Sequence, residues 1–419
     1  MTICHHPSQR LKKSRLPVHI AGLLALIMFL CIPCVAQEKP TPSPGRVSQE
    51  QGASQEQNVS QEQVDAYIQQ LGASSFEARE QAAKELLRLG KVAEQALEKN
   101  VRNPNPEIKR RSRSLLAEIK VHNRNLALSQ FIDGKSPVDQ FPYWARFKSI
   151  AGDNALSRKL YHKMASAEWE LLTLAENAPE QVDYQFYKRA VQLKTKVYST
   201  TQVHPSLGSI STLLFIASDK RVEITGPAYS ELQYLLSAPE LSQALHHPDN
   251  ADAIYKVLNA WVDSCVDNPH LKAENRFIVL LFAIREDLKA GISLAKSVIK
   301  SPIPNNFNLQ NNVHIIYAVL GIAKLGSKKD IAYLETLLDD QQSVYTYISD
   351  NSFETQIRDA ALVGILHIKG KDPKKFGFTR LTVDANYLYS HRTIGFASES
   401  DRKAAFDHWA ADIESETKK

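Results

Sequence analysis

The stretch SSFEAREQAAKELLRLG, residues 74–90, decides the class of fold. Ser74 to Glu77 form a capping box, in which a serine hydroxyl accepts a free backbone N–H and the glutamate reaches back to the cap. The apolar residues that follow share one face of a helix: Phe76, Ala82, Ala83, Leu86 and Leu87. Gly90 tolerates the left-handed backbone in which many helices end. The stretch therefore predicts an amphipathic helix that buries one stripe against a neighbour.

The same kind of pattern recurs along the chain. A short helix is predicted over 92–100, and Pro106 suits the first turn of the next helix because its missing N–H is not needed there. That helix carries an apolar stripe of Ile108, Leu115, Leu116 and Ile119. Further helices are predicted over 156–176, 179–198, 228–236, 239–246, 250–266, 273–288, 309–325 and 328–338. The chain has only 16 glycines and 19 prolines in 419 residues, which favours helices over an all-β fold.

Segment 376–396 has no clear helical period. We expect an irregular C-terminal loop there, whose aromatic side chains fold back onto the helices. These side chains are Phe376, Phe378, Tyr387, Tyr389 and Phe396.

Several segments resemble HEAT repeats, which stack pairs of helices. They are SSFEAREQAAKELLRLG (74–90), NPEIKRRSRSLLAEI (105–119) and FETQIRDAALVGILHI (353–368). The runs GKDPKKFGF (370–378) and GFASESDRKAAFDHWAADI (395–413) are similar to the ends of exported bacterial HEAT-repeat proteins of undefined role. The resemblance implies an all-α, HEAT-like helical repeat array, or α-solenoid, with HEAT-like helices at 64–125 and 309–419. The middle region, 126–308, is expected to be helical by its own pattern.

The first 36 residues have the order of a secretory signal peptide. A basic stretch from Arg10 to Arg15 precedes an apolar stretch over 18–32, and Cys34 and Ala36 occupy the −3 and −1 positions of a cut before Gln37. The apolar stretch is short for a bilayer-spanning helix, which needs about 20 residues. An uncleaved N-terminal anchor is the alternative. Both interpretations predict an exported protein that is periplasmic, bound to the cell envelope or secreted.

Residues 37–63 read as a disordered polar linker, in which SQEQ recurs at 48, 54 and 60. The net charge of the chain is +5, but the segment 1–36 alone holds four cations and no acid. The rest of the chain is therefore nearly neutral, and its charge gives no reason to expect a nucleic-acid partner.

The sequence contains no recognisable catalytic motif. It has no His-Glu-x-x-His, no Gly-x-Ser-x-Gly and no phosphate-binding or dinucleotide-binding glycine loop. We therefore assign no catalytic, cofactor-binding or metal-binding residue and no cofactor. The strongest candidate site is a basic face that could bind a partner, formed by Lys109, Arg110, Arg111 and Arg113. A plain solvated helix face is the alternative.

Other candidate groups have structural interpretations. His246 and His247 suit the end of a helix better than a metal site, since adjacent residues point to different faces. Trp144, Trp169, Trp261 and Trp409 are expected in the core, and Cys265 is expected to be buried and inert. Arg358 and Asp359 are expected to bond to a neighbouring element of the array.

The sequence thus favours a non-catalytic interaction scaffold of the cell envelope, with a protein or peptide partner on the surface of a helical array. The alternative is an unrecognised hydrolytic enzyme acting on envelope glycans or peptides. A membrane-anchored structural protein is a third hypothesis, and it requires an uncleaved N-terminal segment.

Overall fold

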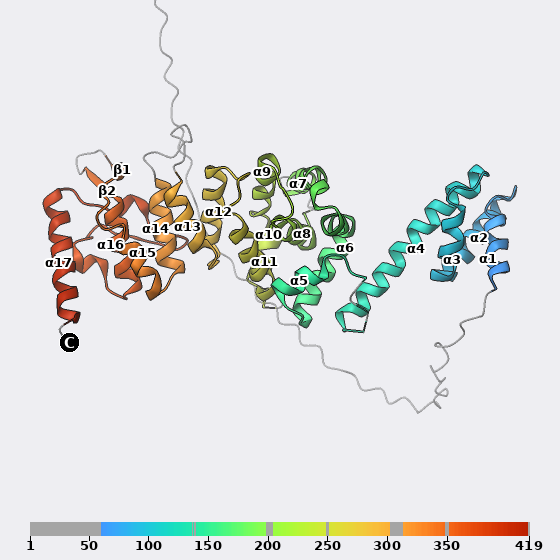
Figure 1. The fold of residues 1–419 in the computed structure, drawn as a ribbon, viewed down its shortest axis with the longest axis horizontal. Coiled ribbons are helices and arrows are strands. Elements are labelled where there is room, and N and C mark those ends of the chain that lie inside the picture. The colour runs from blue at the N-terminus through green and yellow to red at the C-terminus, as the bar shows by residue number, and fades with distance from the viewer. Residues whose placement is uncertain are drawn as a thin grey trace, which may run out of the picture. The chain divides into compact units, whose positions relative to one another are not determined.

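The computed structural model describes residues 60–135, 137, 140–197, 204–248, 251–301, 313–347 and 352–417. The predicted signal segment 1–36 and the linker residues 37–59 lie outside the described residues. From Ser60 onward the described chain belongs to one compact unit. This part of the chain holds 17 α-helices and two small two-stranded sheets, so the all-α prediction is confirmed in its general form (Figure 1). Among the described residues, no helix is both long enough and apolar enough to cross a bilayer.

The first helices are α1 (Gln61–Gln70), α2 (Phe76–Leu89), α3 (Lys91–Asn100) and α4 (Pro106–Ile132). The predicted end of the linker at 63 is wrong, because α1 already begins at Gln61. The Ser60 side chain caps α1 by accepting a hydrogen bond from the Gln63 backbone N–H at 3.3 Å. Val64 and Ile68, one turn apart, are buried and hold the helix in place. The third SQEQ is thus a helix start.

Helix α2 follows the prediction with two differences. Ser75 caps it and Gly90 ends it with a φ of 53°, as expected. Glu77, however, accepts a hydrogen bond from the Ser75 hydroxyl at 2.6 Å, in place of the expected contact with the backbone of the cap. Phe76, expected on the buried stripe, is 59% exposed because it is the first helical residue and lies beyond the contact with the neighbouring helices.

Helix α4 has 27 residues and runs through the predicted boundary between 125 and 126. Asn105 caps it and Pro106 is in its first turn, as predicted. Leu128 and Phe131, beyond that boundary, are buried in the same hydrophobic cluster as the helices that follow. A single helix therefore joins the N-terminal helices to the middle region.

The middle region is helical throughout its described parts, as predicted. Its elements are α5 (Trp144–Ala151), α6 (Ala155–Asn177), the 3₁₀ turn η1 (Pro179–Gln181), α7 (Val182–Val197), α8 (Leu207–Ala217), α9 (Gly226–Leu235), α10 (Pro239–Leu245), α11 (Ala251–Ser264), α12 (Ala273–Arg285) and α13 (Gly291–Lys300). The most extensive packing among these helices joins α6 to α8, α7 to α9 and α8 to α11.

The C-terminal region contains strands that the sequence pattern did not predict. After α14 (Val313–Leu325), η3 (Lys328–Asp330) and α15 (Ile331–Glu335), β1 (Ser343–Tyr347) pairs antiparallel with β2 (Phe353–Gln356). The first four residues of the HEAT-like segment 353–368 are therefore a strand, which the sequence pattern did not predict. Helix α16 (Ile357–Ile368) begins only after Gln356, which forms a capping box with Asp359. Phe353 and Thr355 are buried in the strand, where alternate residues share a face.

The aromatic return over 376–396 is confirmed. It runs through η4 (Pro373–Phe376), a two-residue hairpin of β3 (Val383–Asp384) and β4 (Leu388–Tyr389), and η5 (His391–Thr393) before α17 (Glu399–Thr417). Four of the five expected aromatic side chains are buried and Tyr387 is half-buried; the four are Phe376, Phe378, Tyr389 and Phe396. Phe396 also exchanges two backbone hydrogen bonds with Glu354 of β2.

Candidate functional site

Helix α6 is broken in its middle at Glu168, whose φ of −139° and ψ of 40° are not helical. No proline or glycine lies near this point, so the usual residue causes of a kink are absent from the local sequence. A close contact lies about one turn before it. A Cβ on Gly208 of α8 would be 2.1 Å from the backbone oxygen of Lys163, so α8 lies directly against the backbone of α6. The bend occurs where α6 meets this neighbour.

An ion pair holds the broken segment. Glu168 is buried, and its carboxylate accepts hydrogen bonds from Nε and a terminal nitrogen of Arg189 on α7, at 2.8 and 2.6 Å. The same guanidinium contacts Ser209 Oγ on α8 at 3.4 Å. Three helices therefore meet at one carboxylate. Because Glu168 is committed to this pair, it is poorly placed to serve as a free acid or base.

A cavity of about 570 Å³ opens at the bend. Its walls come from α4, α6 and α7, and we call it the Trp169 groove. The side chains that characterise it are Arg124, Glu168, Trp169, Leu174, Gln185 and Gln192. Its volume lies in the range of small-ligand sites, and its lining mixes an indole ring with carboxamide and guanidinium groups.

Trp169 and Arg124 form the aromatic and cationic wall of the groove. The Arg124 guanidinium lies over the indole ring, 5.0 Å from its centroid, and Phe141 packs against the ring edge-on. Arg124 also pairs with Glu170 at 3.3 Å, but the Glu170 side chain is 89% exposed. Arg124 Nε has no hydrogen-bond partner among the described residues. Because Nε is buried, the donor that this guanidinium can offer a ligand is the terminal nitrogen that pairs with the exposed Glu170.

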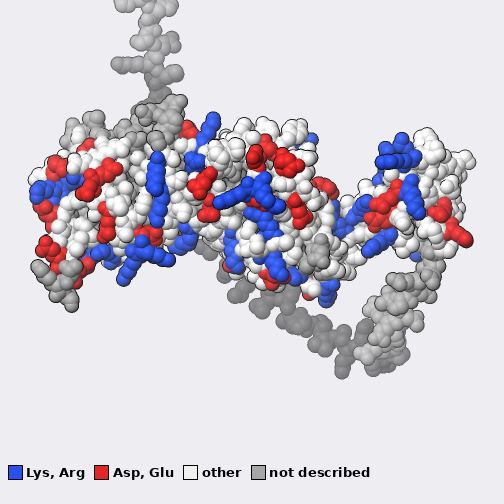
Figure 2. Space-filling view, viewed as in Figure 1, with Lys and Arg blue, Asp and Glu red and all other residues white. Residues whose placement is uncertain are grey.

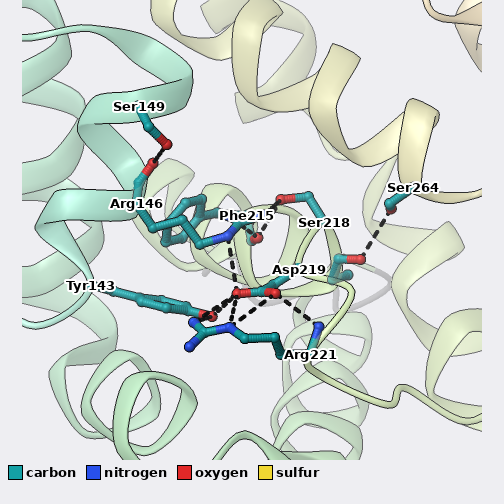
Figure 3. Close-up of polar contacts among 9 residues, drawn as sticks. Tyr143, Arg146, Ser149, Phe215, Ser218, Asp219, Arg221 and Ser264 are labelled. Atoms are coloured by element: carbon teal, nitrogen blue, oxygen red, sulfur yellow. Dashed lines mark hydrogen bonds and ion pairs between the residues drawn. The ribbon is translucent and has the colours of Figure 1, made fainter.

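A second polar cluster lies between α5 and the turn that follows α8 (Figure 3). Asp219 is buried and accepts a hydrogen bond from the Tyr143 hydroxyl, while Arg146 Nε and an Arg221 terminal nitrogen each lie 3.0 Å from its Oδ2. Tyr143 has a φ of 64°, a left-handed conformation that a bulky residue rarely adopts. The cluster holds this strained residue at the start of α5.

The protonation of the cluster follows from these contacts. Burial and the Asp219 carboxylate raise the pKa of Tyr143 to about 12, so the phenol remains a donor. Burial alone would raise the pKa of Asp219, but hydrogen bonds from Arg221 and Tyr143 outweigh it and lower that pKa. Asp219 therefore stays a fully engaged carboxylate, and the cluster acts as a junction between helices.

The predicted basic face is not a set of four free cations. Arg110 and Arg111 pair with Glu107 at 2.8 and 2.7 Å, and these hydrogen bonds lower the pKa of Glu107 to about 2. Arg111 is 13% exposed and also pairs with Glu80 of α2 at 2.9 Å. Arg113 Nε donates to the Val101 carbonyl at 3.1 Å. Lys109 is exposed. Arg111 and Arg113 connect α4 to α2 and to the turn after α3, whereas Arg110 pairs within α4. Partner binding by this face remains a prediction.

The surface charges agree with this mixed arrangement. On the face shown in Figure 2, blue and red side chains are interspersed over the described parts of the chain. The region in view therefore offers small charged groups and no extended surface of one sign.

The structure places the other candidate residues as follows. His246 ends α10, with Nδ1 2.7 Å from the Ser242 carbonyl oxygen, as the helix-end interpretation predicts. In the part of the chain that is described, no group of three or more His, Cys, Asp or Glu residues could hold a metal ion. Cys265 is fully buried, and burial raises the pKa of its thiol to about 12.

The four tryptophans divide into two kinds. Trp144, Trp261 and Trp409 are buried, as predicted. Trp169 is half-buried; it packs against the core, as predicted, and it also lines the groove. The sequence Glu168-Trp169-Glu170 could have indicated that Trp169 lies at the surface of the core, because it puts an acid on each side of the indole.

Arg358 and Asp359 bond to a neighbouring element, as predicted. Asp359 Oδ1 accepts a hydrogen bond from Arg402 Nε at 2.9 Å, and Arg358 donates to Glu399 at 2.7 Å, both on α17. Their role in the described structure is to attach α17 to α16.

Comparison of the chain with protein-family models, with curated proteins and with solved structures finds no significant match.

Proposed function

We propose that the chain is a non-catalytic interaction scaffold of the cell envelope, built as a HEAT-like helical array, and that it binds an extended peptide segment of a protein partner in the Trp169 groove. The observation that carries the proposal is the break in α6. It opens a cavity of about 570 Å³ that is lined by a half-buried indole, a guanidinium and two carboxamides.

The chemistry of the lining favours a peptide. Gln185 and Gln192 can each donate to and accept from a main chain, and an indole can pack against a side chain. Arg124 has a solvated partner in Glu170, which an acidic side chain of the ligand can replace in a charge-assisted hydrogen bond. The favoured occupant is therefore an extended segment with an acidic residue.

The same lining gives less support to a hydrolase. Acid hydrolysis of glycans commonly uses two carboxylates that face the substrate. In this groove Glu168 is bound by Arg189 and Glu170 is largely in solvent. The location in the envelope rests on the signal-like segment 1–36, and the repeat architecture rests on the sequence resemblance to HEAT repeats.

Position-dependent photo-crosslinking tests the proposal. A photo-crosslinking phenylalanine derivative at Gln185 faces the groove, and the same group at Tyr184 lies outside the groove on the same helix and is 68% exposed. We expect crosslinks in envelope material from position 185 to one contiguous peptide, and their loss with Trp169→Ala or Arg124→Gln. A synthetic copy of that peptide should then bind the purified protein.

Two results would contradict the proposal. One is an equal set of crosslinks from positions 184 and 185, which would indicate non-specific contact. The other is turnover of envelope glycans or peptides by the purified protein that is lost with Glu168→Gln, which would favour the enzyme hypothesis.

A further inference from the structure

A second cavity, of about 490 Å³, lies at the C-terminal end of the fold, between the aromatic return and α17. Its floor is made by the buried side chains of Phe376, Phe396 and Ala405. Its rim carries Lys375 and Arg380, which are exposed, together with His408 of α17. We call it the C-terminal cavity. This cavity is separate from the Trp169 groove, since no residue lines both.

Lys375 and Arg380 have no carboxylate partner among the described residues, whereas several other cations nearby do. In the surrounding segment Lys369 and Lys371 pair with Glu416, and Arg402 pairs with Asp359. Within the described residues, by contrast, the side chains of Lys375 and Arg380 have neither an ion-pair partner nor a hydrogen-bond acceptor.

The acid that lines the cavity does not neutralise these cations. The Asp401 carboxylate accepts a hydrogen bond from the Ser398 hydroxyl at 2.7 Å, and the Asp401 backbone N–H donates to the same hydroxyl in the first turn of α17. It is therefore used in capping a helix. Two permanent positive charges face one engaged carboxylate, so the cavity is electrostatically complementary to an anion.

Packing fixes where the cationic and aromatic groups stand. The Arg380 guanidinium lies 4.1 Å from the centroid of the Phe353 ring, and His408 stacks on Phe376 with 4.6 Å between ring centroids. Gly395 lets the wall close, because a Cβ there would be 2.3 Å from the Glu354 carbonyl oxygen. The Arg380 guanidinium and the His408 ring are thus each held against an aromatic side chain.

We propose that the C-terminal cavity binds a small organic anion. Its phosphate or carboxylate group is held by Lys375 and Arg380, and its apolar part rests on the aromatic floor. The volume exceeds what a bare inorganic anion fills and matches the sites of small organic ligands. A guanidinium suits both kinds of group, because its planar donors match two oxygens at once.

Calorimetric titration of the purified protein tests this proposal with three probes. Phenyl phosphate and benzoate carry the two anionic groups on one ring, and benzyl alcohol is the neutral counterpart. We expect saturable binding of at least one anion and none of benzyl alcohol, and the tighter anion identifies the group. Arg380→Gln and Lys375→Gln should each weaken that binding about tenfold or more, the effect of one charge-assisted hydrogen bond.

Lys374→Gln is the matched control, since Lys374 is an exposed neighbour that does not line the cavity. It should leave the affinity nearly unchanged. Circular dichroism melts confirm that the variants are folded. The proposal is overturned if neither anion binds saturably, if benzyl alcohol binds as well as the anions, or if the Lys374 variant loses as much affinity as the others.

Discussion

The carboxylate of Asp359 on α16 and the guanidinium of Arg402 on α17 form an ion pair in which both side chains are almost completely buried, with 2.9 Å between Oδ1 and Nε. Arg402 also donates to the Glu354 carbonyl oxygen at 3.1 Å and pairs with Glu399. One side chain of α17 therefore links the capping box of α16 to strand β2. Similar junctions are formed by Asp219 with Tyr143 and by Glu168 with Arg189.

Replacement of Arg402 by leucine should destabilise the fold by about 3–5 kcal/mol, since it leaves Asp359 as an uncompensated buried charge. The measurement is urea unfolding at pH 7, followed by circular dichroism. The control is Lys403→Ala, which removes an exposed pair with Asp407 and should change stability little. Equal losses in the two variants would show that Arg402 has no special role.

The Arg402 variant should also acquire a distinct pH dependence. Burial raises the pKa of Asp359, and Arg402 opposes that effect, so its removal raises this pKa further. A carboxyl group whose folded pKa lies above its unfolded value destabilises the fold as pH rises through that interval. We expect a larger deficit against the parent protein at pH 7 than at pH 4.5. A deficit independent of pH would exclude this explanation.

Gly208→Ala should be strongly destabilising. The new methyl group would lie 2.1 Å from the Lys163 backbone oxygen, and a backbone atom cannot move away as a flexible side chain can. Overpacking of this kind costs about 1–3 kcal/mol or more. Gly226→Ala is the control, because the nearest atom there is 3.6 Å from the added Cβ. Thermal melts of both variants make the comparison, and similar melting temperatures would contradict the close contact of α6 and α8.

Tyr143→Phe should cost about 1 kcal/mol at pH 8 through the lost hydrogen bond to Asp219. The pH dependence of this stability difference tests the role of the Tyr143 hydroxyl more directly. Burial and Asp219 raise the pKa of Tyr143 to about 12, so its contribution is complete below pH 10, its ordinary value, and is lost as pH rises toward 12. The stability difference between parent and variant should therefore shrink between pH 9 and pH 11. Urea unfolding at the two pH values measures it.

Arg189→Leu should destabilise α6 locally, at the bend around Glu168. It removes the partner of buried Glu168, and because Arg189 is 29% exposed we expect a moderate cost of about 1–3 kcal/mol. Hydrogen exchange should accelerate mainly at residues 164–172 and along α7. Lys188→Gln, at an exposed neighbouring position, should leave exchange unchanged. Uniform acceleration across the chain would indicate global destabilisation without a local role at the bend.

Helix positions were largely predictable because the apolar period and the cap residues are local signals. Ser75, Gly90 and Pro106 mark helix boundaries through their own backbone chemistry, and the structure places them as expected. Strand β2 was missed because Phe353 to Gln356 are too short a segment to show a strand pattern, and pairing with β1 and Phe396 makes them extended. That pairing is not encoded in any short window.

The groove could not have been predicted from the sequence. Arg124, Trp169 and Arg189 come from three helices, α4, α6 and α7, and only tertiary packing brings them together. The Tyr143–Asp219 contact could not be predicted either, since the two residues are 76 positions apart. Likewise, the four residues of the basic face are adjacent in sequence, but three of them turn to different intramolecular acceptors.

The cap at Ser60 has a consequence for how the chain can vary. The same four letters, SQEQ, stand at 48, 54 and 60, and the last copy starts α1. Removal of residues 58–63 would place the second SQEQ, residues 54–57, directly before Val64 and so supply the same cap and the same helix start. The segment before α1 can therefore lose or gain six residues at a time while the cap of α1 is kept. Its length can thus change in evolution without a change in the fold of the helices.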